Sequence, residues 1–237
     1  MKPLTPDLAG AGVTRRELNF ILAVDCSGSM TGEKMASLNY AMRSTLPAMR
    51  EAARDNPETR VLIRVVSFST GAAWQTTAAV PVEDYAWTDL EAGGETATGA
   101  ALREVAAMLT PEVLAARQLP PIIVLISDGQ PTDDFEAGLD ALRHAPFGAK
   151  SVRIAIAIGG DADLDTLKTF VGNDAFAPLQ ANTAEELVNR IKWATTTPVK
   201  AVSRPSVGQS AADTLVMQSA HPHAAATLQG EDNSMVW

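Results

Sequence analysis

The sequence contains few of the residues on which redox chemistry, zinc binding and histidine catalysis depend. Its 237 residues include one cysteine, Cys26, and three histidines, His144, His221 and His223. A single cysteine cannot form a disulfide within the chain, and three histidines leave little material for a zinc site or a Ser-His-Asp triad. These absences argue against a disulfide-stapled domain, a zinc enzyme and a serine hydrolase.

Basic runs and long apolar runs are also missing. Lys and Arg number 19 against 28 Asp and Glu, which gives a formal net charge of -9. Because nucleic acids and anionic membranes are bound through a basic footprint, we expect neither as a partner. No apolar run reaches the roughly 18 residues of a membrane span, and segment 1–7 lacks the apolar stretch of a signal peptide. We therefore expect a soluble, acidic, cytoplasmic protein.

Strand and helix patterns alternate along most of the chain. Nearly continuous apolar runs predict strands buried on both faces at 18–24, 61–68, 122–126 and 152–158. Shorter strands are expected at 72–82, along the edge of the sheet, and at 176–179. Apolar spacings of three and four predict helices at 33–54, 98–109 (with 111–118 as a candidate continuation), 135–144, 164–170 and 183–194. The alternation predicts an α/β fold: a doubly wound, mainly parallel sheet with helices on both faces and one short antiparallel edge strand.

The composition changes toward both ends of the chain. Residues 1–17 are polar and read as a flexible lead-in, and 18–197 carries the strand and helix patterns of the domain. Residues 198–237 have low charge and no sustained periodicity, which predicts a flexible Ser/Thr/Ala-rich tail. Apolar clusters at 215–217 and 235–237 leave two alternatives for the tail, which either docks on a partner or packs back on the domain.

Three loops carry small oxygen-bearing side chains where a parallel sheet binds ligands. Such ligands bind beyond the carboxyl ends of the strands, and these loops follow the strands at 18–24 and 122–126 or precede the helix at 98–109. The candidate metal ligands are Asp25, Ser27, Ser29, Thr96 and Asp128. Carboxylate and hydroxyl oxygens suit Mg²⁺ or Mn²⁺, whereas imidazole and thiolate, which suit zinc or copper, are not offered. The loops therefore predict a magnesium or manganese site.

These residues resemble the metal-ion-dependent adhesion site of the von Willebrand factor A family. The resemblance rests on Asp25-x-Ser27-x-Ser29, on Thr96 after a Gly-Gly pair, and on Asp128 in Ser-Asp-Gly, and it covers roughly residues 18–196. It implies that the three hydroxyls bind the ion directly and that the two carboxylates bind directly or through water.

One residue departs from the family pattern in the second loop. Glu95 lies between the glycine pair and Thr96, so Thr96 and Thr98 remain alternatives for the ligand from this loop. The family resemblance further implies a protein partner that supplies an Asp or Glu carboxylate to the ion. We expect the residues that contact this partner to be Met30, Glu95, Gln130 and Asp133.

Within the family, the chain looks most similar to bacterial tellurium-resistance TerY-type proteins. Segments 121–133 and 191–193, the latter followed by a Ser/Thr/Val-rich stretch, carry this likeness. It implies a scaffold in a bacterial stress-response or defence system that acts with a Ser/Thr protein kinase and a PP2C-type phosphatase.

Two other interpretations of the loops stay open. Asp25 at a strand end beside Mg²⁺ is also placed to accept a phosphoryl group, as in a Mg²⁺-dependent phosphatase-like enzyme. Alternatively, Asp25 and Ser27 only bind backbone N–H groups and hold no ion. The favoured hypothesis is a non-enzymatic, Mg²⁺-dependent protein-interaction module.

Overall fold

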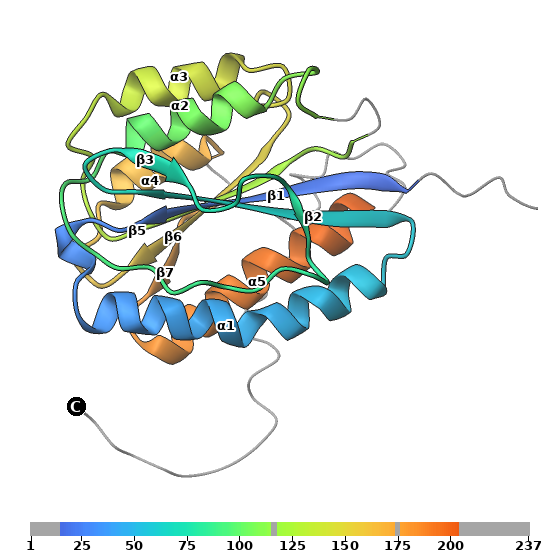
Figure 1. Cartoon of the computed structure of the whole chain (residues 1–237). Coiled ribbons are helices and arrows are strands. Elements are labelled where there is room, and N and C mark those ends of the chain that lie inside the picture. Colours follow the sequence, from blue (N-terminus) through green and yellow to red (C-terminus); the bar gives the residue numbers. More distant parts are fainter. Residues whose placement is uncertain (1–14, 115–117, 174–175, 204–237) are drawn as a thin grey trace, which may run out of the picture.

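The computed structural model describes residues 15–114, 118–173 and 176–203 of the chain. Within these ranges, strands and helices alternate as the sequence predicts (Figure 1). The strands are β1 Arg16–Asp25, β2 Thr59–Phe68, β3 Ala72–Trp74, β4 Val80–Pro81, β5 Ile122–Ser127, β6 Val152–Ile158 and β7 Leu179–Ala181. The helices are α1 Glu33–Arg54, α2 Thr98–Met108, α3 Phe135–His144, α4 Leu164–Val171 and α5 Ala184–Ser203, and a single 3-10 turn, η1, spans Gly28–Met30.

The strands form one mainly parallel sheet in the order β3-β2-β1-β5-β6-β7, with β4 also paired to β2. Strands β2, β1, β5, β6 and β7 run parallel, whereas β3 and β4 run antiparallel to β2. The chain moves from β1 to β2 on one side and later to β5 on the other, so the strand order reverses at β1. The loops that follow β1 and β5 therefore lie at the carboxyl end of the sheet, next to the reversal of strand order, where doubly wound sheets bind ligands.

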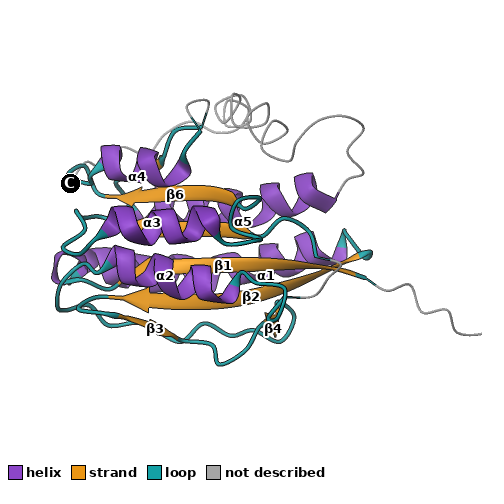
Figure 2. Cartoon of the chain, turned by 90° about the horizontal axis from the view of Figure 1, so that it is seen from above, coloured by secondary structure: helices purple, strands orange, loops and turns teal. Residues whose placement is uncertain are grey.

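Helices cover both faces of the sheet, which confirms the predicted fold class. Helices α1 and α5 pack together on one face, and α2 and α3 pack together on the other, where α4 lies over β6 (Figures 1 and 2). Burial on both faces explains why the central strands are apolar without alternation. All six residues of β5 and the last eight of β1 are buried.

The predicted edge strand at 72–82 is two short strands in the structure. Between them, the Thr76 hydroxyl accepts a hydrogen bond from Val65 N at 3.2 Å, at a point where a continuous strand would use a backbone carbonyl. This side-chain contact interrupts the ladder, so β3 and β4 pair with β2 separately.

Two other boundaries differ from the prediction. The last strand is β7, Leu179–Ala181, and not 176–179, because Phe176 stacks on Trp193 of α5 with ring centroids 5.5 Å apart. Helix α5 continues to Ser203, beyond the helix end predicted at residue 194, because Val199 and Ala201 are buried in the fold. Burial here outweighs the modest helix propensity of the Thr-rich segment and its proline.

Several predictions fall wholly or partly outside the described residues. These are the lead-in up to residue 14, the tail from 204, and part of the candidate continuation at 111–118, of which residues 111–113 form turns. None of the helices in the described ranges is long and apolar enough to cross a bilayer.

Candidate metal centre

Backbone hydrogen bonds bring two of the predicted loops together. Gly28 N donates to Gly94 O at 3.0 Å, and Gly93 N donates to Cys26 O at 2.8 Å. Gly94 has φ +83°, and a Cβ at this position would meet Thr70 Oγ1 at 2.5 Å. The glycine is needed because it allows both this conformation and the close approach of Thr70, in the loop after β2.

Asp25 lies at the carboxyl end of β1 and is fully buried. Its Oδ1 accepts a hydrogen bond from Ser27 N at 2.8 Å, and its Oδ2 accepts one from the Ser127 hydroxyl at 2.5 Å. Burial raises the pKa of the Asp25 carboxyl, and these hydrogen bonds offset part of the effect because they favour the charged form. The carboxylate is thus held in a fixed position beneath the loop.

The two serines connect this loop to the carboxyl end of β5. Ser27 Oγ and Ser29 Oγ lie 2.9 Å apart, and the Ser29 hydroxyl donates to Asp128 Oδ1 at 2.7 Å. Ser27 and Asp128 are buried, while Ser29 is exposed. Two hydroxyls and a carboxylate from separate strands therefore form one continuous hydrogen-bonded chain that reaches the surface.

Thr96 faces this chain from the second loop. A Cβ placed on Gly129 would lie 3.5 Å from Ser29 Oγ and 3.8 Å from Thr96 Oγ1, so both hydroxyls lie beside the same glycine. The Thr96 backbone is held to the third loop, because its N donates to Thr132 Oγ1 at 3.0 Å and its O accepts from Thr132 N at 2.9 Å. Thr98 is instead the first residue of α2. The structure thus favours Thr96 as the threonine at the site.

A cation from the protein itself reaches the site from α1. Lys34 Nζ lies 2.6 Å from Asp128 Oδ2 and 3.3 Å from Asp161 Oδ1. Partial burial lowers the pKa of the Lys34 ammonium, but its contacts with Asp128 and Asp161 outweigh burial and raise the pKa. Lys34 is therefore charged at neutral pH and neutralises part of the acidic site.

The four residues expected to contact a partner differ in their exposure to solvent. Glu95 and Gln130, which lie next to Thr96 and Gly129 along the chain, are exposed. Met30 is fully buried in the hydrophobic core, so the structure corrects its expected role at the surface. Asp133 accepts hydrogen bonds from Gly99 N at 2.8 Å and Ala100 N at 2.7 Å, and so it stabilises the first turn of α2.

The donor set fits a hard divalent cation. Two carboxylates and three hydroxyls provide oxygen ligands only, and the exposed Ser29 leaves access from solvent. In the described part of the chain, no group of three or more His, Cys, Asp or Glu is placed to hold a metal ion. Three of the five proposed ligands, Ser27, Ser29 and Thr96, are neutral because they are hydroxyls. Burial raises the pKa of the neighbouring Cys26 thiol to about 12, so a thiolate is not available to bind the ion.

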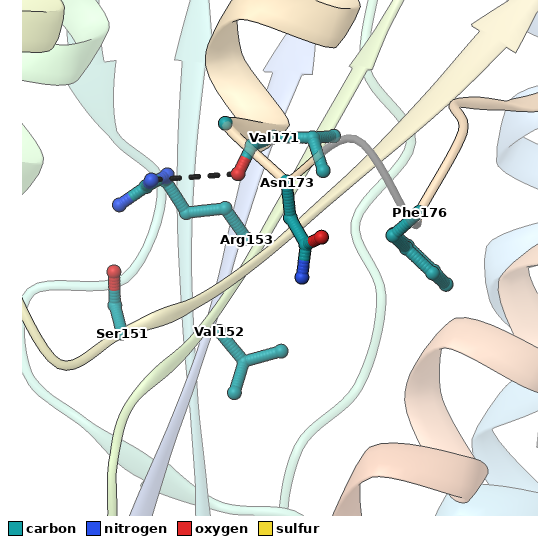
Figure 3. Close-up of a pocket in the computed structure, with 7 residues that line it drawn as sticks. Ser151, Val152, Arg153, Val171, Asn173 and Phe176 are labelled. Carbon is teal, nitrogen blue, oxygen red and sulfur yellow. Dashed lines mark hydrogen bonds between the residues drawn. The ribbon is translucent and has the colours of Figure 1, made fainter. Parts of the chain in front are cut away.

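A cavity of about 190 Å³ lies at the start of β6, where Val152 and Arg153 line it (Figure 3). Arg153 forms one wall and donates to Phe170 O at 2.7 Å and to Val171 O at 3.4 Å. Its guanidinium thus binds carbonyls at the C-terminal end of α4, which is a structural role.

Sequence reasoning missed Ser127, Thr132 and Lys34. Ser127 and Thr132 flank Asp128 in the third loop, so their closeness along the chain was an available signal. Lys34 lies 94 residues from Asp128, and only its position in the first turn of α1, after the first loop, hinted at its placement.

Comparisons with known proteins agree with the fold. A family model of the von Willebrand factor type A domain matches residues 19–190, and the chain therefore belongs to this family. A search of curated proteins finds no match.

Solved structures share the fold at low sequence identity. A von Willebrand factor type A protein from Catenulispora acidiphila has a TM-score of 0.57 and 16% identity, over 76% of this chain and 42% of that one. The pilus adhesin SpaC from Lactobacillus rhamnosus GG, in its open conformation, has a TM-score of 0.63 and 14% identity, over 79% and 30%. Proximal thread matrix protein 1 from the mussel byssus, described with a zinc-occupied MIDAS motif, has a TM-score of 0.56 and 16% identity, over 79% and 46%. This chain thus spans less than half of the length of each of these structures.

Proposed function

We propose that the chain binds one Mg²⁺ or Mn²⁺ ion and uses it to bind a carboxylate of a protein partner. Ser27, Ser29 and Thr96 would bind the ion directly, and Asp25 and Asp128 would bind it directly or through water. The observation that carries the proposal is the hydrogen-bonded chain from Ser27 through Ser29 to Asp128, which joins the ends of two neighbouring parallel strands.

The chemistry of the ligands explains why the ion would bind an acidic group. Hydroxyl ligands add no charge, so an ion whose carboxylates act through water keeps much of its positive charge. An Asp or Glu of a partner would complete the octahedral coordination that Mg²⁺ prefers. The zinc reported in the MIDAS motif of proximal thread matrix protein 1 supports a divalent ion in a domain of this fold.

The resemblance stated for the sequence extends the proposal to a physiological setting. Likeness to TerY-type proteins suggests a scaffold in a bacterial stress-response or defence system, located in the cytoplasm. Its partners would include a Ser/Thr kinase and a PP2C-type phosphatase.

The burial of Asp25 weighs against the phosphatase-like alternative. A nucleophilic carboxylate must reach the phosphorus atom of its substrate. Asp25 has no exposed surface, and its two oxygens accept hydrogen bonds from Ser27 N and from the Ser127 hydroxyl at the end of β5. An interaction module fits this geometry better than an enzyme that uses Asp25.

Two measurements test the proposal. Calorimetric titration with MgCl₂ and MnCl₂ should show one site, which is lost in a Ser27→Ala/Ser29→Ala variant. A pull-down with the full chain should capture a partner with Mg²⁺ present and release it in EDTA, and that capture should be lost in the same variant. Metal-dependent turnover of a generic phosphate ester that disappears in Asp25→Asn would instead support the enzyme.

A further inference from the structure

Lys34 forms an ion pair with Asp128, one of the two carboxylates of the proposed metal site. Its Nζ lies 2.6 Å from Asp128 Oδ2, and the Asp128 side chain is 0% exposed. The same Nζ lies 3.3 Å from Asp161 Oδ1, whose side chain is 76% exposed. One ammonium group thus bridges a buried carboxylate of the site and a carboxylate at the surface.

A glycine lies against the bridge formed by Lys34, and a cavity lies beside the lysine side chain. Gly159 follows β6 with φ +86°, and a Cβ there would meet Asp161 Oδ1 at 2.7 Å and Lys34 Cε at 3.2 Å. A residue with a side chain would therefore push the pair apart. Lys34 also lines a cavity of about 480 Å³ formed by the first turns of α1 and α5 and the ends of β6 and β7. The side chain can move without repacking the core, because it is 27% exposed.

We propose that Lys34 is an internal counter-cation that competes with the divalent ion for Asp128, and that Asp161 retains the ammonium when the ion binds. This inference rests on the proposed metal site. Without the ion, Lys34 neutralises Asp128. With the ion, Lys34 leaves Asp128 and stays at Asp161. Lys34 therefore sets the metal affinity although it is not a ligand.

The physical reason is repulsion between two cations at one buried carboxylate. Charges that are a few ångström apart interact strongly where water is excluded, so an ammonium and a divalent ion weaken each other's binding to Asp128. Asp161 reduces this penalty, because the displaced ammonium keeps an anionic partner. The two residues should consequently change metal affinity in opposite directions, and Asp161 should act through Lys34.

A double-mutant cycle on the full chain tests this arrangement. The dissociation constant of Mn²⁺ is measured by calorimetry, at fixed pH and ionic strength, for wild type, Lys34→Met, Asp161→Asn and the double variant. Lys34→Met should bind Mn²⁺ about tenfold more tightly, and Asp161→Asn about threefold more weakly. In the Lys34→Met background, Asp161→Asn should change the constant by less than about twofold.

Lys168→Met and Asp165→Asn provide matched controls, because this pair has the same 3.3 Å separation on α4 but lies away from the site. Both should bind Mn²⁺ as wild type does. Equal or weaker binding by Lys34→Met would overturn the inference, as would an Asp161→Asn effect of the same size in both backgrounds. If neither wild type nor Lys34→Met binds Mn²⁺ at millimolar concentration, the proposed metal site itself is wrong.

A measurement on wild type keeps the test independent of variants that fold poorly. Labelling with an amine-reactive acylating reagent, read by mass spectrometry, reports how accessible each lysine is. Saturating Mg²⁺ should increase labelling of Lys34 relative to EDTA and leave Lys168 unchanged. Labelling of Lys34 that stays constant or falls would show that the ammonium does not leave the buried carboxylate.

Discussion

Replacement of Ser29 by Ala should weaken metal binding and also destabilise the metal-free protein by a small, calculable amount. The Ser29 hydroxyl donates to the buried carboxylate of Asp128 at 2.7 Å and lies 2.9 Å from the Ser27 hydroxyl. A hydrogen bond to a charged group contributes about 1.5–3 kcal/mol. Because Ser29 is exposed, water can replace part of this bond, and we expect a loss of about 1–2 kcal/mol. For a chain of this size, that corresponds to a fall in melting temperature of about 2–8 °C.

The effect on metal affinity should be larger than the effect on stability. Loss of a group that merely supports a metal ligand typically costs about 10–100-fold in affinity, and Ser29 is proposed as a ligand itself. We therefore expect the dissociation constant of Mg²⁺ to rise by at least about tenfold in Ser29→Ala. Titration calorimetry measures this constant, and thermal melts in EDTA measure the stability.

Ser37→Ala is the matched control, because Ser37 is a half-buried serine of α1 with no side-chain hydrogen bond to any described residue. It should leave both quantities unchanged. Wild-type Mg²⁺ affinity in Ser29→Ala, together with the expected fall in melting temperature, would refute the assignment of Ser29 as a ligand. The loop would then be held together by hydrogen bonds alone.

Three further predictions concern individual residues and the end of the domain. Asp25→Asn should abolish Mg²⁺ binding in calorimetry. In EDTA, the melting temperature of this variant should rise relative to that of wild type between about pH 4 and pH 7, because the raised pKa of Asp25 means that wild type loses stability as its buried carboxyl becomes charged. A difference in melting temperature that stays constant with pH would contradict this. Asp133→Ala should lower stability by about 1–2 kcal/mol in denaturant titrations, because two N–H groups of α2 lose their acceptor, while the Mg²⁺ dissociation constant stays within about twofold. Truncation after Thr197 should lower the melting temperature because it removes buried Val199, whereas truncation after Ser203 should not. Equal melting temperatures of the two truncated proteins would show that the last turns of α5 do not stabilise the fold.

The gathering of the three loops at one edge of the sheet could be predicted from sequence, because the loops adjoin strands and a helix that are easy to recognise. Asp25 comes directly after one apolar run and Asp128 two residues after another, and the topology of a parallel sheet brings such positions to one edge. The helix predicted at 33–54 has the bounds of α1, because its apolar residues recur at spacings of three and four along the whole segment.

Other features depended on packing that a linear pattern does not contain. Met30 follows the serines of the first loop, and only the structure shows that its side chain turns into the core. Asp133 was expected to contact a partner, but its carboxylate binds the N-terminal end of a helix that begins 35 residues earlier in the chain. The extent of α5 was missed because burial of Val199 against the fold overrides the local sequence signal for a helix end.

The central claim is that one divalent ion binds among the hydroxyls of Ser27, Ser29 and Thr96. A crystal structure of the full chain grown with millimolar Mn²⁺, with data collected at the manganese absorption edge, tests it most directly. The account predicts one anomalous peak about 2.1 Å from these three hydroxyl oxygens, with a free position or a bound carboxylate on its solvent side. Absence of the peak, with the Ser27 and Ser29 hydroxyls pointing away from each other, would contradict the account.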